Sequence, residues 1–130
     1  MASKAIVQVM LLTALIVSSA VGAEAAASAN IEPKAPEKYM TFCAPCHGPT
    51  GKGDGLAAAS LNPKPRNFAD GTYMNARTDA QLTNVIKNGS AAEKLSPLMT
   101  GYSNMLNDKE IKDIIAFIRA VAVPKYQPKK

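Results

Sequence analysis

The sequence predicts a small all-α domain, and three features point to this fold class. Apolar residues recur at helical spacing, glycines and prolines separate the periodic segments, and no run alternates apolar and polar residues as a strand would. The 130 residues, 47% hydrophobic and 19% charged, suit one domain with a short appendage. With no Trp and only 5% aromatic residues, the core would be filled more easily around a large buried cofactor.

The first 23 residues are expected to be a secretory signal peptide. Lys4 precedes an apolar run over 5–21 that ends in small residues around Ala23. The alternative is an uncleaved membrane anchor, for which this run is short and contains several polar residues. Cleavage removes Lys4 and no acidic residue, which lowers the formal charge from +5 to +4. We therefore expect an exported, periplasmic protein with no stable membrane insertion after cleavage.

The remaining chain divides into a leader, one domain and a tail. Residues 24–35 are expected to be a flexible leader, because Ala, Ser, Asn and Pro occur there without periodicity. The folded domain is expected over 36–123, and residues 124–130 form a basic C-terminal tail. No internal repeat is visible, so a single core is expected.

Helix signals divide the domain into short segments. Helices are expected over about 36–47, 56–61, 78–88 and 107–123. Thr78 can cap the third helix, with Gln81 three residues later. Asn107 can cap the last helix, and Glu110 again lies three residues after the cap. The last helix has the clearest apolar periodicity and should end before Pro124.

Cys43, Cys46 and His47 form the pattern typical of covalent haem attachment. Two thiols three residues apart can add to the two vinyl groups of one haem, and the next residue places an imidazole under the iron. A thioredoxin-like pair would need a sheet that nothing here predicts, and a zinc site lacks ligands because the chain has only two cysteines and one histidine. A disulfide between these cysteines would stabilise little and leave His47 unexplained. One covalently bound haem c is therefore expected.

The chain resembles the class I monohaem cytochromes c, the small bacterial periplasmic cytochromes related to mitochondrial cytochrome c. The likeness extends from about residue 36 to residue 123. It is carried by Tyr39–Gly48 with the attachment motif, the Gly51–Gly55 loop, the prolines before Arg66, the Met99 region and Leu106–Ile111. The resemblance implies three to five helices wrapped around one haem, with the first and last helices crossing, and Tyr39 and Phe117 are expected to pack at that crossing.

Methionine is the expected second axial ligand of the iron. His47 is the only histidine, which excludes two histidine ligands from one chain. The resemblance implies that Met99 is the ligand, since it lies in a loop before the last helix, and Met105 is the reserve candidate. Of the other methionines of the domain, Met40 is expected to make a core contact and Met74 is expected to line the haem edge. The family usually has proline after its ligand, whereas this chain has Thr100, so we expect a less rigid loop.

The resemblance also implies partners for the haem and its histidine. A carbonyl in the 63–65 stretch is expected to accept the proton on the far nitrogen of His47, and Pro65 is our choice over Pro63. Arg66 is expected to pair with a haem propionate, because a guanidinium matches carboxylate geometry. The alternative for Arg66 is an ordinary solvated arginine.

With both axial positions filled, the expected activity is one-electron transfer and not a substrate reaction. Basic residues could steer docking to an acidic redox partner of a respiratory chain, or serve general solubility. They are Lys34, Lys38, Lys52, Lys64, Lys87 and Lys94, with Lys125, Lys129 and Lys130 in the tail. A formal charge of +4 in an exported chain does not favour nucleic-acid binding. Two alternatives stay open. One is a peroxidase-like or small-ligand-binding haem protein with a labile methionine, and the other is a fixed haem subunit of a larger redox complex.

Overall fold

The structure, a computed structural model, describes residues 32–128, and this part of the chain is all-α, as predicted. Its helices are α1 (Glu37–Phe42), α2 (Ala44–His47), η1 (Leu56–Ser60), α3 (Gly71–Met74), α4 (Asp79–Asn88), η2 (Ser90–Glu93) and α5 (Asp108–Val121), where η denotes a 3-10 helix. Within residues 32–128, no helix is both long and apolar enough to cross a bilayer. The predicted signal peptide and all but the last residues of the predicted leader lie outside the described range.

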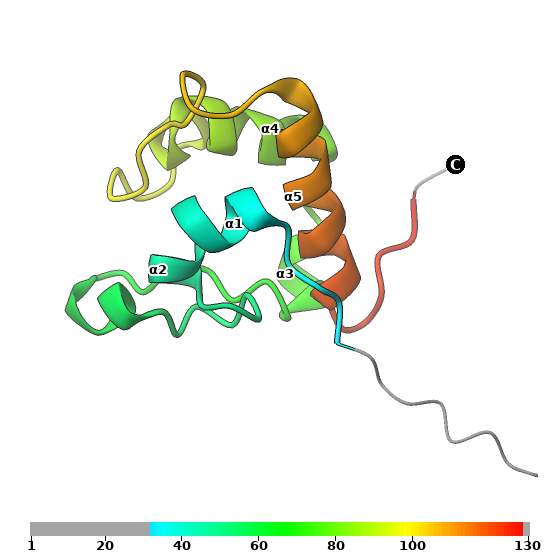
Figure 1. Ribbon diagram of the computed structural model, residues 1–130. Helices are drawn as coiled ribbons and strands as arrows, with labels where there is room; N and C mark the ends of the chain where they lie inside the picture. Colours follow the sequence, from blue (N-terminus) through cyan, green and yellow to red (C-terminus); the bar gives the residue numbers. More distant parts are fainter. Residues whose placement is uncertain (1–31, 129–130) are drawn as a thin grey trace, which may run out of the picture.

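Helix α5 is the longest element and crosses α1 (Figure 1). Asn107 and Glu110 form the predicted capping box, since each side chain accepts a hydrogen bond from the other residue's backbone N–H. One face of α5 is buried in the core and carries Ile111, Ile114, Ile115, Phe117 and Ile118. The rings of Tyr39 and Phe117 lie 4.6 Å apart between centroids, which confirms the packing expected where the first and last helices cross.

Helix α4 packs against α5 and has the boundaries that its signals predicted. Thr78 and Gln81 form the second capping box, and Gly89 follows the helix with a φ of +87°. Leu82 and Ile86 place the apolar face of α4 in the core. Because η2 begins directly after Gly89, the chain turns at once from α4 into the loop that leads to Met99.

The remaining predictions need corrections. The predicted first helix is divided at Cys43 into α1 and α2, and the segment at 56–61 forms a 3-10 helix. Helix α3 was not predicted; it is capped by Asp70, whose carboxylate accepts from the Tyr73 N–H. The core contact assigned to Met40 is wrong, since this side chain is 45% exposed. Tyr39 takes the buried position on α1, and successive residues of a helix point in different directions.

The chain directly after α5 is hydrogen-bonded to the segment around α3 (Figure 1). The Val123 N–H donates to the Ala69 carbonyl, and the Gly71 N–H donates to the Val123 carbonyl, both at 3.0 Å. The Asn75 side chain donates to the carbonyl of Pro124 at 2.9 Å. This segment therefore holds α3 against the end of α5.

Candidate functional site

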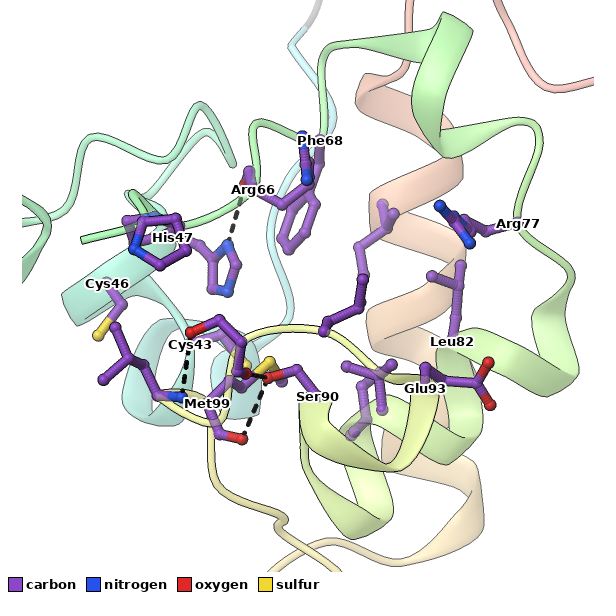
Figure 2. Close-up of a pocket in the computed structure, with 18 of the residues that line it drawn as sticks. Cys43, Cys46, His47, Arg66, Phe68, Arg77, Leu82, Ser90, Glu93 and Met99 are labelled. Atoms are coloured by element: carbon purple, nitrogen blue, oxygen red, sulfur yellow. Dashed lines mark hydrogen bonds between the residues drawn. The ribbon is translucent and has the colours of Figure 1, made fainter. Parts of the chain in front are cut away.

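A cleft of about 260 Å³ opens between the attachment segment and the second half of the domain (Figure 2). One wall comes from the end of α1, α2 and the chain over 61–68, and the other from α3, α4 and the loop over 95–102. The cleft is lined by the first-choice residues for the haem site, namely Cys43, Cys46, His47, Pro65, Arg66 and Met99. Residues far apart in the sequence thus meet at one place.

His47 ends α2 and is 8% exposed. Its Nδ1 lies 3.1 Å from the backbone carbonyl oxygen of Arg66, and its ring stacks on Phe68 with 4.4 Å between centroids (Figure 2). Burial lowers the pKa of His47, although the hydrogen bond to Arg66 acts in the opposite direction. A neutral imidazole that donates from Nδ1 keeps the lone pair of Nε2 for a metal.

The choice of Pro65 as the hydrogen-bond acceptor of His47 is wrong by one residue, because the acceptor is the Arg66 carbonyl. The Pro65 carbonyl faces the glycine loop instead, so that a Cβ at Gly53 would collide with its oxygen. Gly53 also has a φ of +77° and donates its N–H to the His47 carbonyl at 2.8 Å. The glycine loop therefore packs between His47 and the proline-rich stretch and turns the Pro65 carbonyl away from the imidazole.

Both cysteines are free thiols in the structure, and no disulfide joins them. Cys43 is buried and Cys46 is half-buried, and both line the cleft. Burial, and secondarily the nearby Cys46, raise the pKa of the Cys43 thiol to about 11. Both thiols are therefore free to react with a group bound in the cleft.

Of the four methionines within residues 32–128, two line the cleft and two do not. Met99 lines the cleft and packs against the core, and Met74 lines it from α3 with an exposed fraction of 2%. Met105 and Met40 are 50% and 45% exposed and do not line the cleft. The reserve candidate Met105 is therefore not positioned as a ligand in this structure, whereas Met74 faces the same cleft as Met99.

Two arginines and a tyrosine form a cationic cluster at the cleft, which we call the arginine cluster and define as Arg66, Tyr73 and Arg77. The guanidinium carbons of Arg66 and Arg77 lie 3.8 Å and 4.6 Å from the centroid of the Tyr73 ring. Nε of Arg77 is buried and has no hydrogen-bond partner within residues 32–128. Sequence reasoning found Arg66 but not Arg77 or Tyr73, because no local pattern marks residues that meet only in the folded chain.

A family model described as Cytochrome c matches residues 34–122, which is most of the chain. The chain belongs to the cytochrome c family. The match confirms the family that the attachment motif and the fold class predicted. No curated protein and no solved structure matches this cytochrome.

The residues of the cleft fit the haem c that family membership implies. Cys43 and Cys46 supply the two thiols, and the chemistry of His47 suits an iron ligand. Arg66 and Arg77 also line the cleft, and their guanidinium groups suit the acidic side chains of a haem. The donor set and the arginine cluster therefore fit an iron porphyrin with acidic side chains better than a bare metal ion.

Proposed function

We propose that this cytochrome is a periplasmic one-electron carrier with a single covalently bound haem c and with His47 and Met99 as axial ligands. The observation that carries the proposal is the meeting of two free thiols, a buried imidazole and a loop thioether in one cleft. When bound, haem c supplies an iron that accepts and gives up one electron at a time. The protein has to attach it, hold its ligands still and leave no coordination position open.

Each of these tasks has a residue in the cleft. Cys43 and Cys46 attach the haem, and the Arg66 carbonyl and the Phe68 ring hold the plane of the imidazole of His47. The hydrogen bond to Nδ1 also strengthens donation from Nε2 to the iron. With Met99 opposite, dioxygen and peroxide find no free position, which favours electron transfer over the peroxidase-like alternative.

Between the two methionines that face the cleft, Met99 suits ligation better. Met74 belongs to the buried core, and its own backbone carbonyl accepts a hydrogen bond from Arg119 at 2.7 Å. Met99 lies in a loop, is only partly buried and packs against the core from outside. A core methionine that moved to the iron would leave a cavity in well-packed surroundings, whereas a loop methionine would not.

Docking to an acidic redox partner would use lysines that are not engaged within the domain. Lys38 pairs with Glu110 at 3.7 Å and Lys87 pairs with Asp108 at 2.6 Å. Lys64 donates to the carbonyls of Ala58 and Ala59, both at 2.8 Å. Among the candidates before the tail, Lys34, Lys52 and Lys94 take part in no ion pair within residues 32–128.

The direct test uses the haem-loaded protein purified from a periplasmic extract. Mass spectrometry should give a start between Glu24 and Asn30 plus the mass of one haem, and a redox titration should fit a single one-electron step. The oxidised protein should show the weak near-infrared absorption of a sulfur-to-iron bond, and the reduced protein should bind carbon monoxide slowly. Rapid carbon monoxide binding without that band would favour the ligand-binding alternative, and an intact Met1 on membrane-bound material would contradict export.

A further inference from the structure

Ser90 joins both ends of the loop that carries Met99. Its N–H donates to the Met99 carbonyl at 3.1 Å, and its carbonyl accepts from the Leu95 N–H at 3.1 Å. Its hydroxyl donates to the Ser96 carbonyl and lies 3.4 Å from the Met99 carbonyl oxygen (Figure 2). The Ser90 residue is 7% exposed, so these bonds are protected from water. One buried serine thus closes the loop over residues 95–99.

The backbone from Met99 to Ser103 lies directly against the end of α4. The Tyr102 N–H donates to the Ile86 carbonyl at 2.9 Å, and the Ser103 N–H donates to the Lys87 carbonyl at 3.2 Å. A Cβ at Gly89 would lie 2.9 Å from the Met99 carbonyl oxygen. This close approach leaves no room for a side chain between the two segments, which explains a glycine at the junction of α4 and η2.

The same loop is also connected to the attachment segment. The Tyr102 hydroxyl donates to the Phe42 carbonyl at 3.3 Å, one residue before Cys43, and the two rings lie 5.8 Å apart between centroids. The position of Met99 is therefore fixed relative to α4 and relative to the cysteines. The sequence predicted a less rigid loop because Thr100 replaces the usual proline, but hydrogen bonds hold this loop where a proline ring would restrict it.

We propose that Ser90 is the positioning residue of Met99: its hydroxyl and amide hold the 95–99 loop in the conformation that presents the Met99 thioether to the haem iron. The inference rests on the proposed function, since it assumes that Met99 is the ligand. The hydroxyl acts through the carbonyls of Ser96 and Met99 and needs no contact with the haem. Removing it leaves two loop carbonyls without that donor, so the loop opens more often and the iron–sulfur bond breaks more often.

The test compares haem-loaded Ser90→Ala, Ser90→Thr, Ser103→Ala and Asn107→Ala with the parent. Three quantities are measured: the pH at which the oxidised protein loses its near-infrared band, the rate of carbon monoxide binding to the reduced protein, and the denaturant midpoint. Ser103→Ala removes an exposed hydroxyl with no side-chain hydrogen bond within residues 32–128, close to the same loop. Asn107→Ala removes the cap of α5 and lowers global stability without touching the loop.

Ser90→Ala should bind carbon monoxide about tenfold faster and lose the band about one pH unit lower, the factor expected for one buried hydrogen bond. Ser90→Thr keeps the hydroxyl and should restore parental behaviour, and Ser103→Ala should match the parent. Asn107→Ala should lower the denaturant midpoint with little change in the band. If Ser90→Ala yields no haem-loaded protein, Ser90→Gly removes the same hydroxyl and takes its place.

Each other result has a separate meaning. A Ser90→Ala protein that behaves like the parent, a Ser90→Thr protein that behaves like Ser90→Ala, or an equal effect of Asn107→Ala would overturn the positioning role and leave Met99 ligation intact. A parent that lacks the band, or a Met99→Ala variant that keeps it, would show that Met99 is not the ligand. The proposed ligation would then be wrong, and the role of Ser90 would fail with it.

Discussion

Arg119 of α5 and Asp79 of α4 are joined by two hydrogen bonds, from Nε at 3.0 Å and from Nη2 at 2.8 Å, to one carboxylate oxygen. The same guanidinium donates to the carbonyls of Met74 at 2.7 Å and Arg77 at 2.6 Å, and the ring of Tyr126 covers it at 3.9 Å. Arg119 is only 9% exposed. It therefore holds the chain from the end of α3 to the start of α4, which contributes Met74 and Arg77 to the cleft.

Replacing Arg119 with Met should lower the free energy of unfolding by about 3 kcal/mol, because a buried, charged hydrogen-bond network loses its donor. Denaturant unfolding of the haem-loaded protein measures the change. Lys109→Met is the matched control, since its pair with Asp113 lies on the exposed side of the same helix and should contribute nothing measurable. Equal effects of the two substitutions would contradict the role of Arg119.

Covalent attachment predicts a simple chemical result. The parent should keep its haem after denaturation in acidic organic solvent, whereas Cys43→Ala/Cys46→Ala should release it, because only thioether bonds survive that treatment. Absorption of the solvent layer and the mass of the polypeptide measure the outcome. Haem released from the parent would show that the two thiols, although they face one cleft, do not attach it.

The arginine cluster predicts an effect on the reduction potential. Removing the charge of Arg77, which lines the cleft, should favour the more positive oxidised haem. Arg77→Gln should lower the potential by on the order of 40 mV, the one-electron equivalent of about 1 kcal/mol. Lys109→Gln removes an equal charge from the outer face of α5 and should leave the potential unchanged in a redox titration. Equal shifts would mean that net charge, and not contact with the haem, sets the effect.

Local signals in the sequence were sufficient for α4 and α5, the two helices that begin with a capping box. The capping boxes of Thr78 with Gln81 and of Asn107 with Glu110 involve residues three positions apart, so the sequence shows both partners together. Helix α3 has four residues and cannot display helical periodicity. Its place depends on the contact with Val123, which no local pattern reveals.

Within the site, the sequence identified residue types better than orientations. Cys43, Cys46 and His47 of the attachment motif lie together at one cleft because one helical turn determines their spacing. The acceptor for His47 depended on the direction of a carbonyl, which turns away at Pro65 and toward the ring at Arg66. That direction is set by packing of the glycine loop and is a tertiary property.

The Met99→Ala variant tests whether this protein is an electron carrier or a ligand-binding haem protein. The haem should stay attached through the unchanged cysteines, while the near-infrared band disappears and carbon monoxide binds the reduced protein readily. The potential should fall, because the lost thioether favours the reduced metal. Met105→Ala should change none of this, since that side chain is half exposed and does not line the cleft.

Met74→Leu is the more demanding comparison, because Met74 faces the same cleft and differs from Met99 in being part of the core. Leucine keeps the apolar volume and removes the sulfur, so a packing residue should lose less than about 1.5 kcal/mol of stability and keep the band. If Met74→Leu loses the band while Met99→Ala retains it, the ligand comes from α3 and the loop over 95–102 only closes the cleft. If both variants keep the band, neither of these two thioethers binds the iron. The proposed ligand pair of His47 and Met99 would then be wrong, and the sixth ligand would be a different residue.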